Sequence, residues 1–217
     1  MSLCVICGAD ATDTTATFAP FITARTGLPS QTTSVDCPRC GIHYCGHRFT
    51  DEQAAAIYAD YRSPAYHDQR AVLEPDYGYW RAMPTVRPYD VEPIISRWVT
   101  PATVLDIGGH DGANTPFRDT AEVTVVDIGD PEPTGRWNLA VLQHVLEHVA
   151  DPCALVAMAR RHADWLYVEV PVEPRVDVWH EHVNQFSATS LTWTVGHVIA
   201  TEVLDTKVGL VRWAVAR

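Results

Sequence analysis

The cysteines near the start of the chain are its clearest candidates for metal chemistry. Cys4 and Cys7 form one CxxC pair, Cys37 and Cys40 form another, and 29 residues separate the two. Two such turns offer four thiolates, which complete a tetrahedral zinc site without an open position. The spacing therefore predicts a structural zinc site in a loop-dominated module over residues 1–50.

Two other interpretations of the cysteine pairs stay open. The thiols could form a redox dithiol or bind nothing, although paired cysteines in a chain without an export signal favour a metal. The first residues, MSLCVICGAD, show no basic segment and no long apolar run, so we expect a cytoplasmic protein. Cys45, His43 and His47 lie close by in the sequence and could replace a ligand.

A glycine-rich turn with acidic neighbours is the second candidate for chemistry. The stretch VLDIGGHDG (104–112) predicts a strand, a turn and the start of a helix, and the next predicted strand ends near Asp127. Glycines let a ligand approach the backbone at the carboxyl end of a strand, and an acid at the end of the second strand can accept both ribose hydroxyls. The acids Asp106 and Asp111 disfavour phosphate, so a cationic or zwitterionic nucleoside is expected.

The elements that must position these residues alternate between strand and helix patterns from residue 89 onward. Apolar runs that alternate with helices are typical of a doubly wound, mostly parallel α/β sheet. The expected strands are 103–107, 123–128, 139–145 and 165–172, the expected helices are 90–99, 151–162 and 187–198, and the last two apolar runs form a hairpin.

Residues 51–88 form a connector between the cysteine-rich module and an α/β domain over 89–217. The connector begins with a helix that Thr50 can cap, because Gln53 follows three residues later as in a capping box. Its tyrosines and Trp80 predict packing between the modules, or a lid that binds the substrate. Its arginines are expected to be solvated or salt-bridged, with binding of an anionic substrate as the alternative; they are Arg62, Arg70, Arg81 and Arg87.

Several motifs in order resemble class I S-adenosylmethionine-dependent methyltransferases, and the sugar C-methyltransferase group most closely. DIGGHDG (106–112) is similar to the first motif of that class. LAVLQHVLEHVADP (139–152) is similar to its later strand and helix, and HEHVNQFS (180–187) to the segment after the fifth strand. The cysteine pairs resemble the zinc-binding domain ahead of these enzymes. The resemblance implies a Rossmann-like methyltransferase sheet.

The resemblance also implies roles for individual residues. Glu181 and His182 match a general base pair, although without the resemblance they would be interpreted as a surface ion pair. His144 and His148 are more often structural than catalytic. The residues that the resemblance places around S-adenosylmethionine are Asp106, Gly108, Gly109, Gly112, Asp127, Ile128, Leu142, Gln143 and His144.

One departure from the family pattern concerns the pocket for adenine. Only 11 residues separate Asp127 from Leu139, where the family fits a helix and a third strand. We therefore expect a reduced sheet that lacks the third strand.

The composition disfavours two classes of partner, nucleic acid and the membrane interior. The formal net charge of -11 disfavours a protein that grips nucleic acid, because such binding needs a basic surface. No apolar run is long enough to span a membrane. The expected function is base-assisted methyl transfer to a small molecule, sugar-derived or a natural-product intermediate. An RNA methyltransferase with the zinc module as clamp, and a non-catalytic binding protein, are the alternatives, and the sequence leaves the oligomeric state open.

Overall fold

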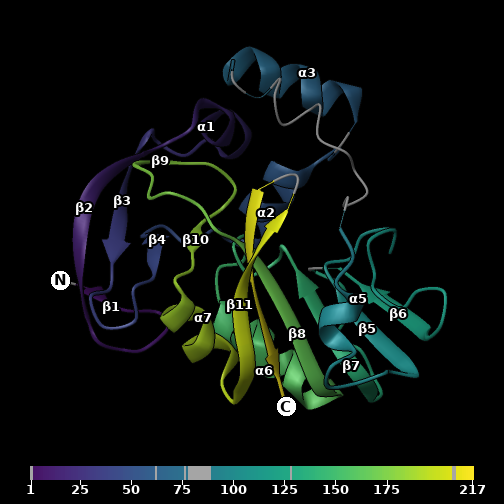
Figure 1. Ribbon diagram of the computed structural model, residues 1–217. Coiled ribbons are helices and arrows are strands. Elements are labelled where there is room, and N and C mark those ends of the chain that lie inside the picture. Colours follow the sequence, from purple (N-terminus) through teal and green to yellow (C-terminus); the bar gives the residue numbers. More distant parts are fainter. Residues whose placement is uncertain (1, 62, 76, 78–88, 128, 207–208) are drawn as a thin grey trace.

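The protein contains two β-sheets that lie side by side in the computed structural model (Figure 1). The structure describes residues 2–61, 63–75, 77, 89–127, 129–206 and 209–217. The N-terminal sheet has the order β1-β2-β3-β4-β10, with β9 paired to β2. Its strands are β1 (Ser2–Leu3), β2 (Asp10–Phe18), β3 (Gln31–Asp36), β4 (His43–Cys45), β9 (Val178–Trp179) and β10 (Asn184–Gln185).

The second sheet has the order β11-β12-β8-β7-β5-β6. Strands β6, β5, β7 and β8 are parallel, whereas β12 and β11 are antiparallel. The predicted mostly parallel sheet and its terminal hairpin are therefore confirmed. The bounds are β5 (Thr103–Ile107), β6 (Glu122–Val126), β7 (Trp137–Gln143), β8 (Ala163–Pro171), β11 (Val198–Thr206) and β12 (Gly209–Ala216).

Strand β6 is the outer edge of this sheet. The described residues of the segment 127–136 form no strand beside β6. Among them, the strand that the family places between β6 and β7 along the chain is therefore missing, as predicted. The prediction of a helix after the glycine turn was wrong, because residues 108–121 form turns and bends. The helix expected over 90–99 is shorter than predicted, since α5 covers Glu92–Ile95.

Alternate residues of the parallel strands face two different layers. Leu105 and Leu142 belong to the core that includes α6 (Pro152–His162) and α7 (Ala188–Val195). Their neighbours, such as Val104, pack with Ile94 and Ile95 of α5 on the other face. Both faces are buried, as is usual for parallel strands in α/β proteins.

The N-terminal module is richer in strands than the sequence analysis predicted. Residues 10–18 form the long strand β2, in which Ala11, Ala16 and Phe18 are buried among exposed threonines and acids. The loop-dominated interpretation was wrong because these few apolar positions obscure the alternation in the sequence. The buried side of this module shares one core with the second sheet.

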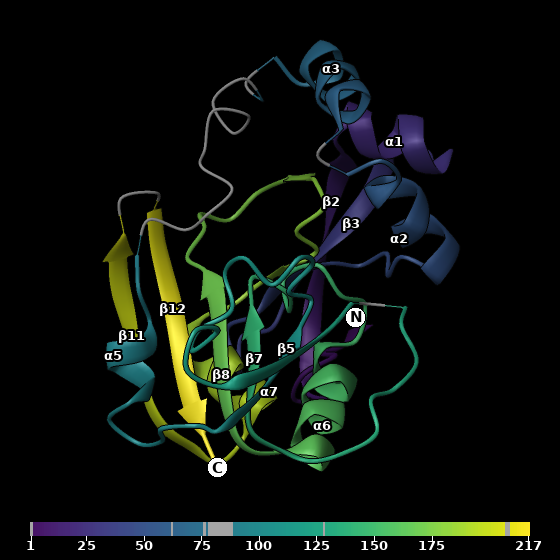
Figure 2. The same ribbon diagram turned by 90° about the vertical axis from the view of Figure 1, so that its right-hand side faces the viewer.

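Three further helices gather at one end of the molecule. Figure 2 shows α1 (Pro20–Thr26), α2 (Asp51–Tyr58) and α3 (Pro64–Leu73) on the side opposite α6. The Thr50–Gln53 capping box predicted for α2 is present, and Ser187 caps α7. Among the described residues, no helix is long and apolar enough to cross a membrane.

Arg48 ties the two sheets together at their junction. Its guanidinium donates to the carbonyl oxygens of Val149 and Ala150 at 2.9 and 2.6 Å, and to Oδ1 of Asn184 at 2.8 Å. Asn184 donates in turn to the carbonyl oxygens of Leu146 and Val149, both at 2.8 Å. Arg48 therefore connects three segments that are distant in the sequence, and burial lowers its pKa.

We expect Arg48→Met to lower the free energy of unfolding by about 3 kcal/mol, because several acceptors at the junction, some of them partly buried, lose a charged donor. Urea denaturation followed by tryptophan fluorescence measures the loss. Arg136→Met is the control, since Arg136 is exposed and pairs with Asp164 at the surface; its expected cost is below about 1 kcal/mol. Equal losses in both variants would contradict the role of Arg48.

Candidate active site and metal centre

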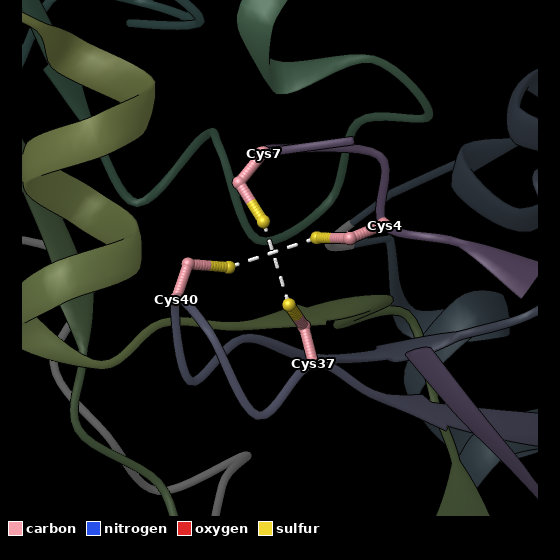
Figure 3. A group of neighbouring side chains, drawn as sticks. All are labelled: Cys4, Cys7, Cys37 and Cys40. Atoms are coloured by element: carbon pink, nitrogen blue, oxygen red, sulfur yellow. Dashed lines mark hydrogen bonds between the residues drawn. The ribbon is translucent and has the colours of Figure 1, made fainter. Parts of the chain in front are cut away.

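Four cysteine side chains point toward a common centre in the N-terminal module (Figure 3). The Sγ atoms of Cys4 and Cys40 lie 3.6 Å apart, and those of Cys7 and Cys37 lie 3.4 Å apart. All four sulfur atoms fall within 4.8 Å of one another. Tetrahedral zinc with Zn–S bonds of about 2.3 Å requires sulfur separations of about 3.8 Å. The donor set and its spacing therefore fit a zinc ion.

The neighbouring residues that could have replaced a ligand are bonded elsewhere. The ring of His43 contacts Asp36 Oδ1 and the carbonyl oxygen of Val176, both at 3.0 Å. His47 bonds to Gln53 at 2.9 Å. Cys45 is fully buried, with its sulfur 3.7 Å from the Thr32 hydroxyl. The four predicted cysteines are thus the ones that converge.

The glycine turn after β5 is built over a buried carboxylate. Asp106 is 4% exposed and accepts a short hydrogen bond from the Thr115 hydroxyl. A Cβ atom at Gly109 would lie 2.2 Å from Oδ2 of Asp106, so a side chain cannot fit there. Gly108 and Gly112 have φ of +77° and +70°, a region that favours glycine. Asp106 therefore supports the turn from below.

The other predicted cofactor residues differ in how far they are exposed to solvent. Asp127 is exposed at the end of β6, and its Oδ1 accepts from the backbone N–H of His110 across the turn at 3.4 Å. Gln143 is 8% exposed at the end of β7. Leu142, one residue before the end of β7, is fully buried in the core. Ile128 lies outside the described residues.

The segment with Glu181 and His182 is held by the N-terminal sheet. Strand β9, just before it, runs parallel to β2, and β10, just after it, pairs with β4. The backbone N–H groups of Val183 and Asn184 donate to the carbonyl oxygen of Glu147 at 2.7 and 3.0 Å. These bonds bring the segment against the turn that follows β7.

Glu181 forms a bidentate ion pair with Arg70 of α3. The Oε1 and Oε2 atoms of Glu181 accept from the two terminal nitrogens of Arg70 at 2.8 and 2.6 Å. The Nε atom of Arg70 donates to Glu74 at 2.8 Å. Burial by itself would raise the pKa of Glu181, but the Arg70 charge and nearby histidines lower it to about 2. Glu181 is therefore ionised, and both of its oxygens are bound by Arg70.

His182 and His148 lie against each other, with ring centroids 4.5 Å apart. Burial lowers the pKa of His182, but the hydrogen bond to Glu173, at 2.7 Å from Nδ1, and the surrounding carboxylates raise it to about 9. Burial and the charge of His182 lower the pKa of His148 to about 4. The hydroxyl of Tyr58 lies 2.7 Å from Nδ1 of His148.

His144 sits between two fully buried carboxylates at the end of β7. Its Nε2 is 3.1 Å from Glu169 and its Nδ1 is 3.3 Å from Glu147. Its φ of 55° is unusual for a residue other than glycine, and such strain is concentrated at functional sites. Glu169 also accepts from the hydroxyls of Tyr89 and Tyr167. Acidic groups therefore surround the carboxyl ends of β7 and β8.

Sequence patterns did not identify several residues of this site. Arg70 was predicted to be solvated, salt-bridged or bound to an anion, and it proves to be the partner of Glu181. Glu169 and Glu173 carried no motif, although an acid inside the apolar strand β8 was a usable signal for Glu169. The buried Tyr66 and Tyr77 pack in the core around α1, as the packing interpretation of the connector predicted. Residues 62, 76 and 78–88 lie outside the described part.

A family model described as a methyltransferase domain matches residues 79–198, which is more than half of the 217 residues. The chain belongs to this methyltransferase-domain family. The match covers the glycine turn, Asp127 and the segment with Glu181 and His182, so this site is the carboxyl edge of a methyltransferase sheet. The search of curated proteins found no match.

Solved structures with a similar fold include several methyltransferases. The 1,6-didemethyltoxoflavin-N1-methyltransferase of Burkholderia thailandensis, bound to 1,6-didemethyltoxoflavin and S-adenosylhomocysteine, is 17% identical with a TM-score of 0.50; the match covers 86% of this chain and 95% of that one. The N-terminal domain of EvdMO1 with SAH bound is 16% identical (TM-score 0.42; 65% and 84% covered). CalO1, a methyltransferase in calicheamicin biosynthesis, is 19% identical (TM-score 0.42; 70% and 59% covered).

We expect Arg70→Met to destabilise this methyltransferase by about 3 kcal/mol, because Glu181 is left buried without its counter-ion. Glu181→Gln should cost less in the Arg70→Met background than in the wild type, with a coupling energy of at least about 1 kcal/mol. Urea denaturation of the two single variants and the double variant measures the cycle. Additive effects would show that the two side chains do not depend on each other.

Proposed function

We propose that this chain transfers a methyl group from S-adenosylmethionine to a small-molecule acceptor. The observation that carries the proposal is the juxtaposition of the glycine turn with Asp127 at the ends of β5 and β6. His110 N–H bonds to Asp127 across this turn, so ligand-binding backbone and a ribose-binding carboxylate share one edge. The 1,6-didemethyltoxoflavin-N1-methyltransferase with a similar fold has 1,6-didemethyltoxoflavin and S-adenosylhomocysteine bound, in keeping with this function.

The residues present fit the cofactor in charge, and three glycines keep the backbone of the turn free of side chains. S-adenosylmethionine contains no phosphate, so the acids around the turn do not repel it. Their negative charge favours its sulfonium and amino groups. Gly108, Gly109 and Gly112 would let the methionine part approach the backbone, and Asp127 would accept from the ribose hydroxyls. S-adenosylmethionine, when bound, supplies an electrophilic methyl group. Because β6 is the edge strand, adenine would have to lie against the loop that follows it.

We propose that Glu181 and His182 have different roles in removing a proton from the methyl acceptor. Both oxygens of Glu181 are engaged by Arg70, so this carboxylate positions the segment. The Nε2 atom of His182 makes no hydrogen bond to the described residues, and we propose that it accepts the proton. Glu173 holds the ring through Nδ1 and stabilises its charged form, as an acid does in a triad. Because these contacts raise the pKa of His182 to about 9, only the neutral form of the ring can accept the proton, so turnover should rise with pH up to about 9. Unchanged turnover in His182→Gln would remove this role.

We also propose the modules 1–50, 51–88 and 89–217, with residues 178–185 of the last module joined to the N-terminal sheet, and a structural role for zinc in the first. Zinc at the four cysteines would fix β3 and β4, and β4 pairs with β10 next to His182. A sugar-derived or natural-product acceptor is proposed from the motif resemblance, and the net charge of -11 weighs against nucleic acid.

We expect the protein to bind S-adenosylhomocysteine with micromolar affinity in calorimetric titrations. Asp127→Ala should weaken binding about 10- to 100-fold, because hydrogen bonds to a charged group contribute about 1.5–3 kcal/mol. Asp119→Ala is the matched control, since Asp119 is a highly exposed carboxylate in the connection between β5 and β6. If the folded wild-type protein bound neither S-adenosylmethionine nor S-adenosylhomocysteine, the interpretation as a non-catalytic binding protein would be favoured instead.

We expect Cys37→Ser to abolish tight zinc binding and to unfold the N-terminal sheet, since a structural zinc site contributes on the order of 10–16 kcal/mol of apparent folding free energy. Elemental analysis should give one zinc per wild-type chain and none in the variant. Cys153→Ser is the control, because Cys153 lies in α6 outside the cluster. Equal zinc content in all three proteins would contradict the four-cysteine site.

A further inference from the structure

A second group of possible metal ligands lies at the junction of the two sheets, away from the cysteines. Glu147, His148 and His182 each offer one ligand atom, and these atoms fall within 4.8 Å of one another. Glu147 and His148 come from the turn after β7, and His182 comes from the segment between β9 and β10. The backbone bonds from Val183 and Asn184 to Glu147 hold these two segments together.

The carboxylate of Glu147 is buried without a hydrogen bond. The side chain is 1% exposed, and neither oxygen has a hydrogen-bond partner among the described residues. The closest ring nitrogens are Nδ1 of His144 at 3.3 Å and Nε2 of His148 at 3.8 Å. A buried ionised carboxylate is costly unless it is paired or coordinates a metal ion. The partners of Glu147 among the described residues are imidazoles at 3.3 and 3.8 Å, which make no hydrogen bond to either oxygen, so both oxygens are available to a metal ion.

Both imidazoles are oriented from behind in the manner of metal ligands. Nδ1 of His182 bonds to the carboxylate of Glu173 at 2.7 Å. Nδ1 of His148 lies 2.7 Å from the Tyr58 hydroxyl and 3.3 Å from the carbonyl oxygen of Glu181. Metal-bound histidines usually donate their other ring N–H to a carboxylate or a carbonyl, which fixes the tautomer and leaves Nε2 for the ion.

From this geometry we infer that Glu147, His148 and His182 bind a divalent transition-metal ion. Two imidazoles and one carboxylate suit zinc or iron(II) better than magnesium, which prefers oxygen ligands. Three protein ligands leave coordination positions open, unlike the four cysteines. In combination with the proposed function, an oxygen of the acceptor would occupy an open position.

This site gives Nε2 of His182 a different role from the proposed base. A nitrogen that coordinates an ion cannot accept a proton, and a metal lowers the pKa of an oxygen bound to it. The two roles are alternatives for the same atom, so a count of bound metal ions separates them.

The test is a titration of zinc-replete, gel-filtered full-length protein with Co²⁺, followed by calorimetry and visible absorption. We expect one cobalt ion to bind per chain beyond the tightly held zinc, without a thiolate-to-cobalt charge-transfer band. No binding of cobalt, or cobalt that shows the thiolate band because it replaces zinc, would overturn the inference. The wild-type stoichiometry decides the matter without any variant.

Variants then assign the ligands. Glu147→Gln and His182→Gln should weaken cobalt binding at least about 10-fold, while their zinc content reports that the fold is retained. His180→Gln should keep wild-type cobalt binding, because His180 lies in the same segment but bonds to Glu74. Wild-type cobalt affinity in both ligand variants would contradict the site. Calorimetry with S-adenosylhomocysteine on the same samples tests the proposed function separately, since either site can fail while the other binds.

Discussion

The partly buried guanidinium of Arg48 is the constraint on which the relation between the two sheets depends. Its hydrogen bonds reach the carbonyl oxygen of Val149, in the segment after β7, and the side chain of Asn184 in β10, which itself donates to the carbonyl oxygen of Leu146. Unpaired carbonyl groups at such a junction would be costly to bury. One charged side chain with several donors satisfies many of them together, so the arrangement of the sheets follows from hydrogen bonding as well as from apolar packing.

This junction also explains why an N-terminal module matters to chemistry at the other sheet. The chain leaves β8, crosses to the N-terminal sheet as β9, and returns through β10. Glu181 and His182 lie in the crossing segment, so their positions depend on β2 and β4 rather than on the parallel strands alone. The four cysteines anchor the same sheet, and a metal there would stabilise the frame that holds the catalytic candidates.

The carboxyl edge of the parallel sheet concentrates negative charge to an unusual degree. Asp106, Glu147 and Glu169 are each at most 4% exposed, and each lies at the end of a strand or in the turn after it. Histidines and Arg70 balance them, which keeps the pKa values of Glu147 and Glu181 low despite burial. Such an edge is suited to cationic ligands and metal ions, and unsuited to phosphates.

The sequence by itself determined the local features of this protein. It placed β5 and α6 closely, identified the Thr50 cap, and indicated the missing third strand from 11 residues, because periodicity, capping and chain length are local properties. It also identified the four cysteines whose sulfur atoms converge. Only the tertiary structure decided that Arg70 would neutralise Glu181 across 111 residues, that residues 178–185 would join the N-terminal sheet, and that Leu142 would face the core. Partners of buried charges depend on which distant segments meet, and no local pattern in one sequence specifies that.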